Sequence, residues 1–194
     1  MLAAIELAVR NVREGRGGPF AALVVKGRKV VAEGTNVVTS TNDPTAHAEI
    51  VAIREACRKL GTYQLRGCRI YTTCEPCPMC LGALYWARPD RVYYGATAHD
   101  AALAGFDDAF IYRELGLPVR ERRLRMRQLM RRQSLAAFEE WLEKEDRILP
   151  KEDVEISHRL RRVLTLQGIK VMVNTDAVDA RISDGGNVIL NYTT

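Results

Sequence analysis

The chain has 194 residues, of which 47% are hydrophobic, and its formal net charge at pH 7 is +5. This length allows one well-buried domain with at most an appendage, and it excludes two full-sized domains. No run of about 18 apolar residues occurs, and the N-terminus has neither a basic leader nor a small-residue cleavage site, so we expect a soluble, cytoplasmic protein and no membrane association.

The N-terminal part of the chain is expected to form a helix, a β-hairpin and a polar loop. Apolar residues at helical spacing predict a helix over residues 1–13, which is followed by a glycine-rich stretch that ends it. Two β-rich runs, 20–25 and 30–33, flank the turn sequence KGRK and indicate a hairpin. Residues 39–44 (TSTNDP) then read as a polar loop.

Two further helices are predicted, with a short strand between them. The first covers residues 46–60, whose apolar positions share a face, and it places His47 and Glu49 in its first turn. Residues 69–73 predict a buried strand, which leads into a second helix over 77–86 with a proline tolerated near its start.

The rest of the domain continues the alternation of strands and helices. We expect a strand over 91–95, a helical patch over 100–104, a loop over 105–108 and a helix over 135–144. Strands that alternate with helices indicate an α/β fold, here a three-layer α/β/α sandwich.

Much of the positive charge is concentrated in residues 120–132. This segment, RERRLRMRQLMRR, carries seven arginines against one glutamate. We interpret it as a solvated, partly amphipathic stretch, with an RNA-contacting patch as the alternative.

Three residues offer the ligands of a catalytic zinc site. Three of the five cysteines fall between positions 74 and 80, a bunching that suits a metal or redox site better than a disulfide framework. His47 supplies an imidazole, and Cys77 and Cys80 supply two thiolates from the first turn of one helix, where thiol pKa values are lowered. Three protein ligands leave a fourth position open for water, as zinc hydrolases require.

Glu49 is the candidate proton carrier of this site. It lies two residues after His47, so on a helix its side chain points beside the metal rather than at it. Its expected role is to take a proton from the attacking water and to pass it to a ring nitrogen and on to the leaving amine. Together, His47-Ala48-Glu49 and Pro76-Cys77-Pro78-Met79-Cys80 match the H-x-E and P-C-x-x-C signature of zinc-dependent nucleobase deaminases.

Two other interpretations of these cysteines stay open at this point. The C-x-x-C pair could be a thioredoxin-like redox motif, although that leaves the H-x-E element unexplained. Alternatively, Cys74 could complete a closed structural zinc site, which would give Glu49 no function.

Four long stretches resemble the cytidine deaminase superfamily and, within it, the bacterial guanine deaminases. They are GGPFAALVVKGRKVVAEGTN (17–36), TNDPTAHAEIVAIREACRKLGTYQL (41–65), TTCEPCPMCLGALYWARP (72–89) and AGFDDAFIYREL (104–115). The tRNA adenosine deaminases share a stretch similar to NDPTAHAEI, and the segments LYWARP and GFDD favour the guanine deaminases. The resemblance covers roughly residues 1–147, which we expect to form the deaminase domain, and it implies a mixed five-stranded sheet.

The resemblance also implies a set of site residues. One zinc ion per subunit would bind His47, Cys77 and Cys80. Glu49 and Asp108 would be catalytic, with Asp108 near the leaving amine, although Asp108 could instead cap a helix that begins near Ala109. The implied substrate-binding residues are Asn36, Phe20, Ala48 and Trp86, where core or dimer packing is the alternative for the two aromatic residues.

The implied reaction is the hydrolytic deamination of guanine to xanthine and ammonia. The alternatives are a guanosine or other aminated-heterocycle deaminase and a tRNA adenosine deaminase, while nucleic acid is not the expected partner. The resemblance further implies a homodimer that exchanges its C-terminal helix. The guanine deaminases end shortly after the position of Trp141, with an aromatic residue that covers the partner's pocket, but this chain continues to residue 194.

Residues 148–194 are expected to form a C-terminal extension whose role the sequence does not define. The sequence predicts a helix over 153–166, a strand over 169–173 and a hairpin around 184–187. The run from residue 148 resembles a fragment of the nicotinamide-binding domain of flavoprotein disulfide reductases. The glycine-rich phosphate loop of such a domain is missing, so we interpret the extension as a packing or assembly element.

Overall fold

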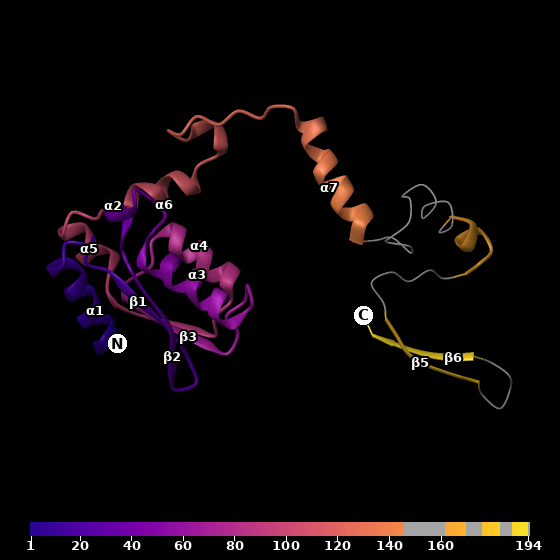
Figure 1. The fold of residues 1–194 in the computed structure, drawn as a ribbon. Coiled ribbons are helices and arrows are strands. Elements are labelled where there is room, and N and C mark those ends of the chain that lie inside the picture. Colours follow the sequence, from indigo (N-terminus) through magenta and orange to yellow (C-terminus); the bar gives the residue numbers. More distant parts are fainter. Residues whose placement is uncertain (146–161, 170–175, 183–187, 194) are drawn as a thin grey trace. The chain divides into compact units, whose positions relative to one another are not determined.

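The computed structural model describes residues 1–145, 162–169, 176–182 and 188–193 (Figure 1). The chain divides into two compact units, Met1–Arg125 and Met126–Thr194. The predicted boundary between the deaminase domain and the extension, at residue 147, lies outside the described residues and stays a prediction. Among the helices that the structure describes, none combines the length and the apolar character needed to cross a membrane.

The first unit is built on a mixed four-stranded sheet with the order β2-β1-β3-β4. Strand β1 is antiparallel to both β2 and β3, whereas β3 is parallel to β4. The predicted hairpin and both later strands are therefore confirmed, and the described part of this sheet has four strands where five were expected. The strands are β1 (Ala21–Lys26), β2 (Lys29–Thr35), β3 (Cys68–Cys74) and β4 (Arg91–Ala96).

Helices cover both faces of this sheet, which confirms the predicted α/β/α sandwich. Helix α1 (Leu2–Arg13) packs on β1 and β3, and α3 (Ala48–Leu60) packs on β2 and β1, with α4 (Pro78–Ala87) beside α3 (Figure 1). The two predicted helices that carry the metal ligands are thus present. Helix α3 begins two positions later than expected, at residue 48, and α4 begins one position later, at residue 78.

Small side chains let α3 approach the sheet closely. Ala52 and Ala56 of α3 are fully buried against Val24 and Ile70 of the sheet. A Cβ atom on Gly34 of β2 would lie 2.2 Å from the carbonyl oxygen of Ala48, so the helix start rests directly on the strand. This contact fixes the height of the first turn of α3, which bears the candidate proton carrier.

Four short helical segments complete the first unit. The predicted helical patch is confirmed as α5, and α6 is the helix near Ala109 that was considered only as an element that Asp108 could cap. One turn of helix, α2, lies where a polar loop was expected, because the hydroxyls of Ser40 and Thr41 donate to the carbonyl of Val37 and close the turn. The segments are α2 (Val38–Thr41), α5 (Ala98–Leu103), α6 (Ala109–Gly116) and the 3-10 turn η1 (Val119–Glu121).

The second unit contains the predicted C-terminal helix and a hairpin. Helix α7 (Arg131–Glu145) includes the expected range 135–144. Strands β5 (Asp176–Ile182) and β6 (Val188–Thr193) pair antiparallel, as the predicted hairpin requires, although its turn lies outside the described residues. Of the helix predicted over 153–166, only residues 162–166 are described, and they are helical. The strand predicted over 169–173 falls almost entirely outside the described range.

Candidate active site

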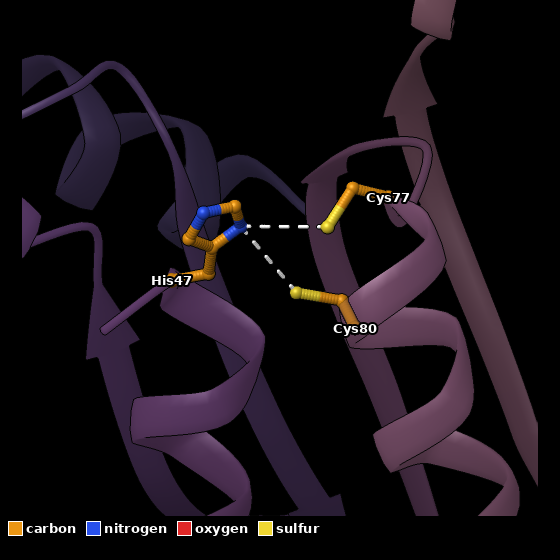
Figure 2. Close-up of side chains that lie close together, drawn as sticks. All are labelled: His47, Cys77 and Cys80. Carbon is orange, nitrogen blue, oxygen red and sulfur yellow. Dashed lines mark hydrogen bonds between the residues drawn. The ribbon is translucent and has the colours of Figure 1, made fainter. Parts of the chain in front are cut away.

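The three predicted metal ligands meet where α3 and α4 begin. His47 immediately precedes α3 with extended backbone angles (φ −69°, ψ 155°), and Cys77 precedes α4 in the same way (φ −63°, ψ 168°). Nδ1 of His47 lies 3.5 Å from Sγ of Cys77 and 3.6 Å from Sγ of Cys80. Figure 2 shows the imidazole ring turned toward both sulfur atoms. The two helix starts therefore bring one nitrogen and two sulfur atoms to a single point.

This ligand set fits a tetrahedral zinc ion. Zn–N and Zn–S bonds of ordinary length at a tetrahedral angle separate nitrogen from sulfur by roughly 3.5 Å, close to the distances observed here. The ligand atoms of His47, Cys77 and Cys80 all lie within 4.8 Å of one another. Three protein ligands leave the fourth position for water, the arrangement of a catalytic zinc site rather than of a closed structural one.

Cys74 does not belong to the cluster. It ends β3, and its thiol donates to the carbonyl oxygen of Thr97 at a distance of 3.6 Å. Burial raises the pKa of this thiol to about 11, which disfavours the thiolate that a metal requires. The alternative of a structural zinc site with Cys74 as fourth ligand is thus not supported by the geometry.

The electrostatics of the cluster favour a cation. The neighbouring Cys80 side chain lowers the pKa of Cys77 to about 4, with a further contribution from His47. The pKa of Cys80 is raised, first by the neighbouring Cys77 side chain and then by burial. Because two adjacent thiolates repel each other in a buried site, a dication is what allows both cysteines to be charged.

Glu49 is buried directly behind the metal ligands. Its Oε1 accepts a hydrogen bond from the hydroxyl of Thr72 at 3.2 Å, and its Oε2 accepts one from the thiol of Cys80 at 3.4 Å. The residue is 6% exposed, and this burial raises the pKa of its carboxyl group. A carboxyl group with a raised pKa can hold a proton between two steps of a reaction.

A cavity of about 270 Å³ opens beside the cluster. Six of the predicted site residues line it, namely Phe20, Asn36, His47, Glu49, Cys77 and Asp108. Its lining among the described residues contains no arginine or lysine, and its volume is near the lower limit of about 300 Å³ for small-molecule pockets. The cavity therefore suits one small heterocycle better than a strand of nucleic acid.

The carboxamide of Asn36 is oriented by a neighbouring backbone group. Its Oδ1 accepts a hydrogen bond from the N–H of Val38 at 3.4 Å, which only the oxygen end of the amide can do. The residue is 9% exposed and lines the cavity. The NH₂ group is thereby left to donate a hydrogen bond.

Asp107, and not Asp108, closes the turn before α6. Oδ1 of Asp107 accepts the N–H of Ala109 at 2.9 Å, whereas the side chain of Asp108 makes no capping hydrogen bond. Asp108 therefore occupies the N-cap position of α6, but its side chain does not satisfy a backbone N–H of the first turn. Burial raises the pKa of Asp108, whose side chain lines the cavity.

Several residues that line the cavity were not predicted as site residues from the sequence, among them Phe106 and Glu75. The ring of Phe106 meets that of Phe20 edge to face, with centroids 4.9 Å apart and planes at 84°. Glu75 also lines the cavity, and its Oε2 accepts the N–H of Ala98 at 3.0 Å. Phe106 lies inside the segment GFDD and Glu75 beside the P-C-x-x-C motif, so their positions in those segments were the available signals.

Two predicted substrate-binding residues do not line the cavity of their own chain. Ala48 is fully buried in the core cluster, between α3 and the sheet. Trp86 is 80% exposed on α4. The structure thus gives neither side chain a contact with this cavity, and their roles in binding stay predictions.

Residues 1–96 match the family described as the cytidine and deoxycytidylate deaminase zinc-binding region. With the α/β/α fold and the His-Cys-Cys cluster, this match defines a zinc-dependent deaminase of that class, and zinc is its cofactor.

Two guanine deaminases are similar to the chain over much of their length. The chain is 55% identical over 138 residues to the guanine deaminase of Bacillus subtilis, covering 71% of this chain and 88% of that protein. The crystal structure of guanine deaminase from that organism matches with a TM-score of 0.70 over 72% of this chain and 88% of the other. A guanine deaminase from Nitrosomonas europaea matches with a TM-score of 0.52 and 36% identity, over 55% and 62% of the two chains.

A tRNA-specific adenosine deaminase from Aquifex aeolicus is 46% identical over 78 residues, which cover 40% of this chain and 52% of that protein. The similarity to this protein is thus shorter than the similarity to the Bacillus subtilis enzyme. The chain belongs to the guanine deaminase family.

Proposed function

We propose that this protein catalyses the hydrolytic deamination of guanine to xanthine and ammonia. The observation that carries the proposal is one small cavity lined by the metal ligands His47 and Cys77, the carboxyl groups of Glu49 and Asp108, and the amide of Asn36. These groups are what addition of water to an aminated ring carbon requires.

His47, Cys77 and Cys80 would hold the zinc ion, which supplies an acidified water when bound. Glu49 takes a proton from the attacking water as the oxygen of that water adds to C2 of the purine, and it delivers the proton to the adjacent ring nitrogen. A second proton then passes from the new hydroxyl group on C2 through Glu49 to the exocyclic amine, the bond from C2 to the amine nitrogen breaks, and ammonia leaves. The raised pKa of Glu49 supports its part in both transfers.

Asn36 and Asp108 would orient the base. The free NH₂ group of Asn36 donates to a carbonyl oxygen, which guanine has at C6 and where adenine has an amino group. The carboxyl group of Asp108 accepts from the exocyclic amine and guides its departure. Phe20, backed by Phe106 at 4.9 Å, offers a ring against the purine face.

The size and charge of the cavity favour a free base as substrate. A nucleoside such as guanosine adds a ribose to the same base, and a volume of about 270 Å³ leaves little room for it. Recognition of a tRNA stem-loop needs basic groups beside the pocket, and the described lining residues supply none. Guanosine deamination and tRNA adenosine deamination are therefore the alternatives to be tested.

We also propose that the protein is a homodimer in the cytoplasm. A second cavity of about 500 Å³, lined mainly by apolar residues, lies along α4 and β4, and Leu81, Tyr85 and Tyr94 line it. Tyr85 and its neighbour Trp86 are 77% and 80% exposed, which is unusual for such large apolar side chains. On this arrangement, Trp86 would reach a bound purine only in the site of the second copy.

The C-terminal helix would be exchanged between the subunits of this dimer. In support of the exchange, Phe138 and Trp141 of α7 are 66% and 61% exposed, so this helix has an apolar face to bury. We assign residues 1–147 to the deaminase domain and 148–194 to an appended assembly element. The likeness of that element to a flavoprotein fragment remains a prediction.

The test of the activity is a comparison of substrates with the zinc-loaded protein. Guanine, guanosine, adenine, cytidine and a tRNA stem-loop are supplied separately, and ammonia release and the ultraviolet spectrum are followed. Turnover of guanine without turnover of the others supports the proposal. If guanosine or the stem-loop is deaminated and guanine is not, then that molecule, and not guanine, is the substrate.

A further inference from the structure

Asn11 is a buried polar residue in the last turn of α1. It is 2% exposed, although asparagine is a poor former of helix interiors and a buried amide is costly unless it is hydrogen-bonded. It does not line the cavity beside the zinc ligands. Neither the hydrolytic mechanism nor the fold of α1 accounts for an amide at this position.

The side chain of Asn11 joins two loops that are distant in sequence. Its Nδ2 donates to the carbonyl oxygen of Gly18 at 3.0 Å and to the carbonyl oxygen of Asn36 at 2.9 Å. Its Oδ1 is buried and has no hydrogen-bond partner within the part of the chain that the structure describes. Because both partners can only accept, the residue is used here as a double donor, which a carboxylate cannot be.

One of these carbonyl groups belongs to Asn36, which lines the cavity, and the other lies close in sequence to Phe20, which also lines it. Gly18 lies two residues before Phe20, and the carbonyl oxygen of Phe20 accepts the N–H of Asn36 at 3.0 Å. A Cβ atom on Gly17 would lie 2.2 Å from the carbonyl oxygen of Asn36, so the two loops are packed backbone to backbone. The bonds from Asn11 thus link the segment before Phe20 to Asn36 itself.

We propose that Asn11 is a positioning residue for substrate binding, which fixes the Asn36 amide and the Phe20 ring relative to each other by holding the carbonyl groups of Gly18 and Asn36. The proposal rests on the proposed deamination of guanine. On this proposal, the relative positions of the Asn36 amide and the Phe20 ring depend on a residue of α1 that contacts neither the substrate nor the zinc ion. The metal ligands and Glu49 lie at the starts of α3 and α4, and Asn11 makes no hydrogen bond to them.

The test compares Asn11→Ala and Asn11→Asp with Ala8→Gly. Asn11→Ala removes both donors and keeps a good helix former, and Asn11→Asp keeps the shape without the donors. Ala8 is also buried on α1, at 5% exposure, so Ala8→Gly weakens the same helix without touching either loop. Guanine kinetics, zinc content, melting temperature, xanthine binding and amide exchange are measured for each variant.

Both Asn11 variants are expected to raise KM for guanine and the Kd for xanthine by about tenfold, the effect of losing ordinary hydrogen bonds. Their kcat should change by less than about threefold, and zinc should stay bound, since the proton carrier and ligands are not disturbed. The backbone N–H of Asn36 should exchange faster in both Asn11 variants than in wild type. Ala8→Gly should lower the melting temperature and leave KM unchanged.

An unchanged KM in both Asn11 variants, or a KM that rises equally in Ala8→Gly, would overturn the positioning role. Amide exchange at residues 17–20 and 36–38 needs no substrate. Failure of the wild-type protein to turn over guanine would therefore reject the proposed function while this contact is still tested.

Discussion

The hydroxyl of Thr72 on β3 donates a hydrogen bond to Oε1 of Glu49 on α3, with 3.2 Å between the two oxygen atoms. Thr72 is 1% exposed, so this bond is shielded from water and joins the centre of the sheet to the proposed proton carrier. Of the two carboxylate oxygens, Oε1 is thereby held by the strand, and Oε2 lies on the side of Cys80.

Replacement of Thr72 by valine should therefore slow the reaction. Thr72→Val keeps the side-chain shape but removes the donor, and we expect kcat to fall about tenfold with zinc content unchanged. The control is Thr73→Val, because the Thr73 hydroxyl accepts the N–H of Ala21 at 3.1 Å and has no contact with Glu49. Steady-state kinetics of both variants check this, and an equal loss of kcat in Thr73→Val would contradict it.

Metal analysis separates the three ligands from the fourth nearby cysteine. Wild-type protein is expected to bind about one zinc ion per chain, and Cys80→Ser should lose most of it because a thiolate ligand is removed. Cys74→Ser should keep the zinc, since the Cys74 thiol donates to the carbonyl of Thr97 instead. Atomic emission after dialysis measures both, and loss of zinc from Cys74→Ser would restore the four-ligand structural site.

Asp107 and Asp108 offer a matched pair of adjacent substitutions. Asp108→Asn should lower kcat/KM at least 100-fold by replacing the charged carboxylate that accepts from the leaving amine with a neutral amide. Asp107 also lines the cavity, but its carboxylate accepts the N–H of Ala109 at 2.9 Å, and an amide oxygen can still accept that bond, so Asp107→Asn should cost little activity and little stability. Similar activities of the two variants would show that Asp108 is not part of the chemistry.

The pH dependence of stability should also change in Asp108→Asn. Burial raises the pKa of Asp108 in the folded protein, so its ionised form opposes folding at neutral pH. This destabilisation disappears as the pH falls through the pKa of Asp108 in the folded protein. Replacement of the carboxyl group by a neutral amide removes the destabilisation at every pH. Melting temperatures are thus expected to favour the variant above that pKa and to converge with wild type in acid. A lower melting temperature for Asp108→Asn than for wild type at neutral pH would contradict this prediction.

The proposed dimer surface is tested by charge. Tyr85→Lys should convert the dimer to a monomer by placing an ammonium group on the apolar cavity along α4. Tyr63→Lys is the control, because Tyr63 is equally exposed, at 81%, and does not line that cavity. Sedimentation velocity distinguishes the two, and a Tyr85→Lys protein that remains dimeric would place the interface elsewhere.

The metal site was predictable because its ligands lie in two short motifs. His47 and the Cys77–Cys80 pair each stand at a helix start, and local sequence determines both starts. The alternation of strands and helices likewise predicted the α/β/α layers. The turn α2 was missed because it depends on two hydroxyl contacts with one carbonyl group and not on hydrophobic periodicity.

Residues that depend on tertiary neighbours could not be found in the same way. Thr72 reads as one more β-branched strand residue, and its role follows only from its hydrogen bond with Glu49, which is distant in sequence. Phe106 is identified only by its contact with Phe20, which lies 86 positions earlier in the sequence (106 − 20). Asn11 has no motif around it, and its two acceptors become visible only once both loops are placed beside α1.

The most direct test of the account is ammonia and xanthine production from guanine by the zinc-loaded wild-type protein and by Glu49→Gln. We expect one ammonia for each xanthine formed by the wild type, and a fall in kcat of about 1,000-fold or more in the variant, with zinc retained. Undiminished turnover by a zinc-loaded Glu49→Gln protein would contradict the central claim that Glu49 carries the proton.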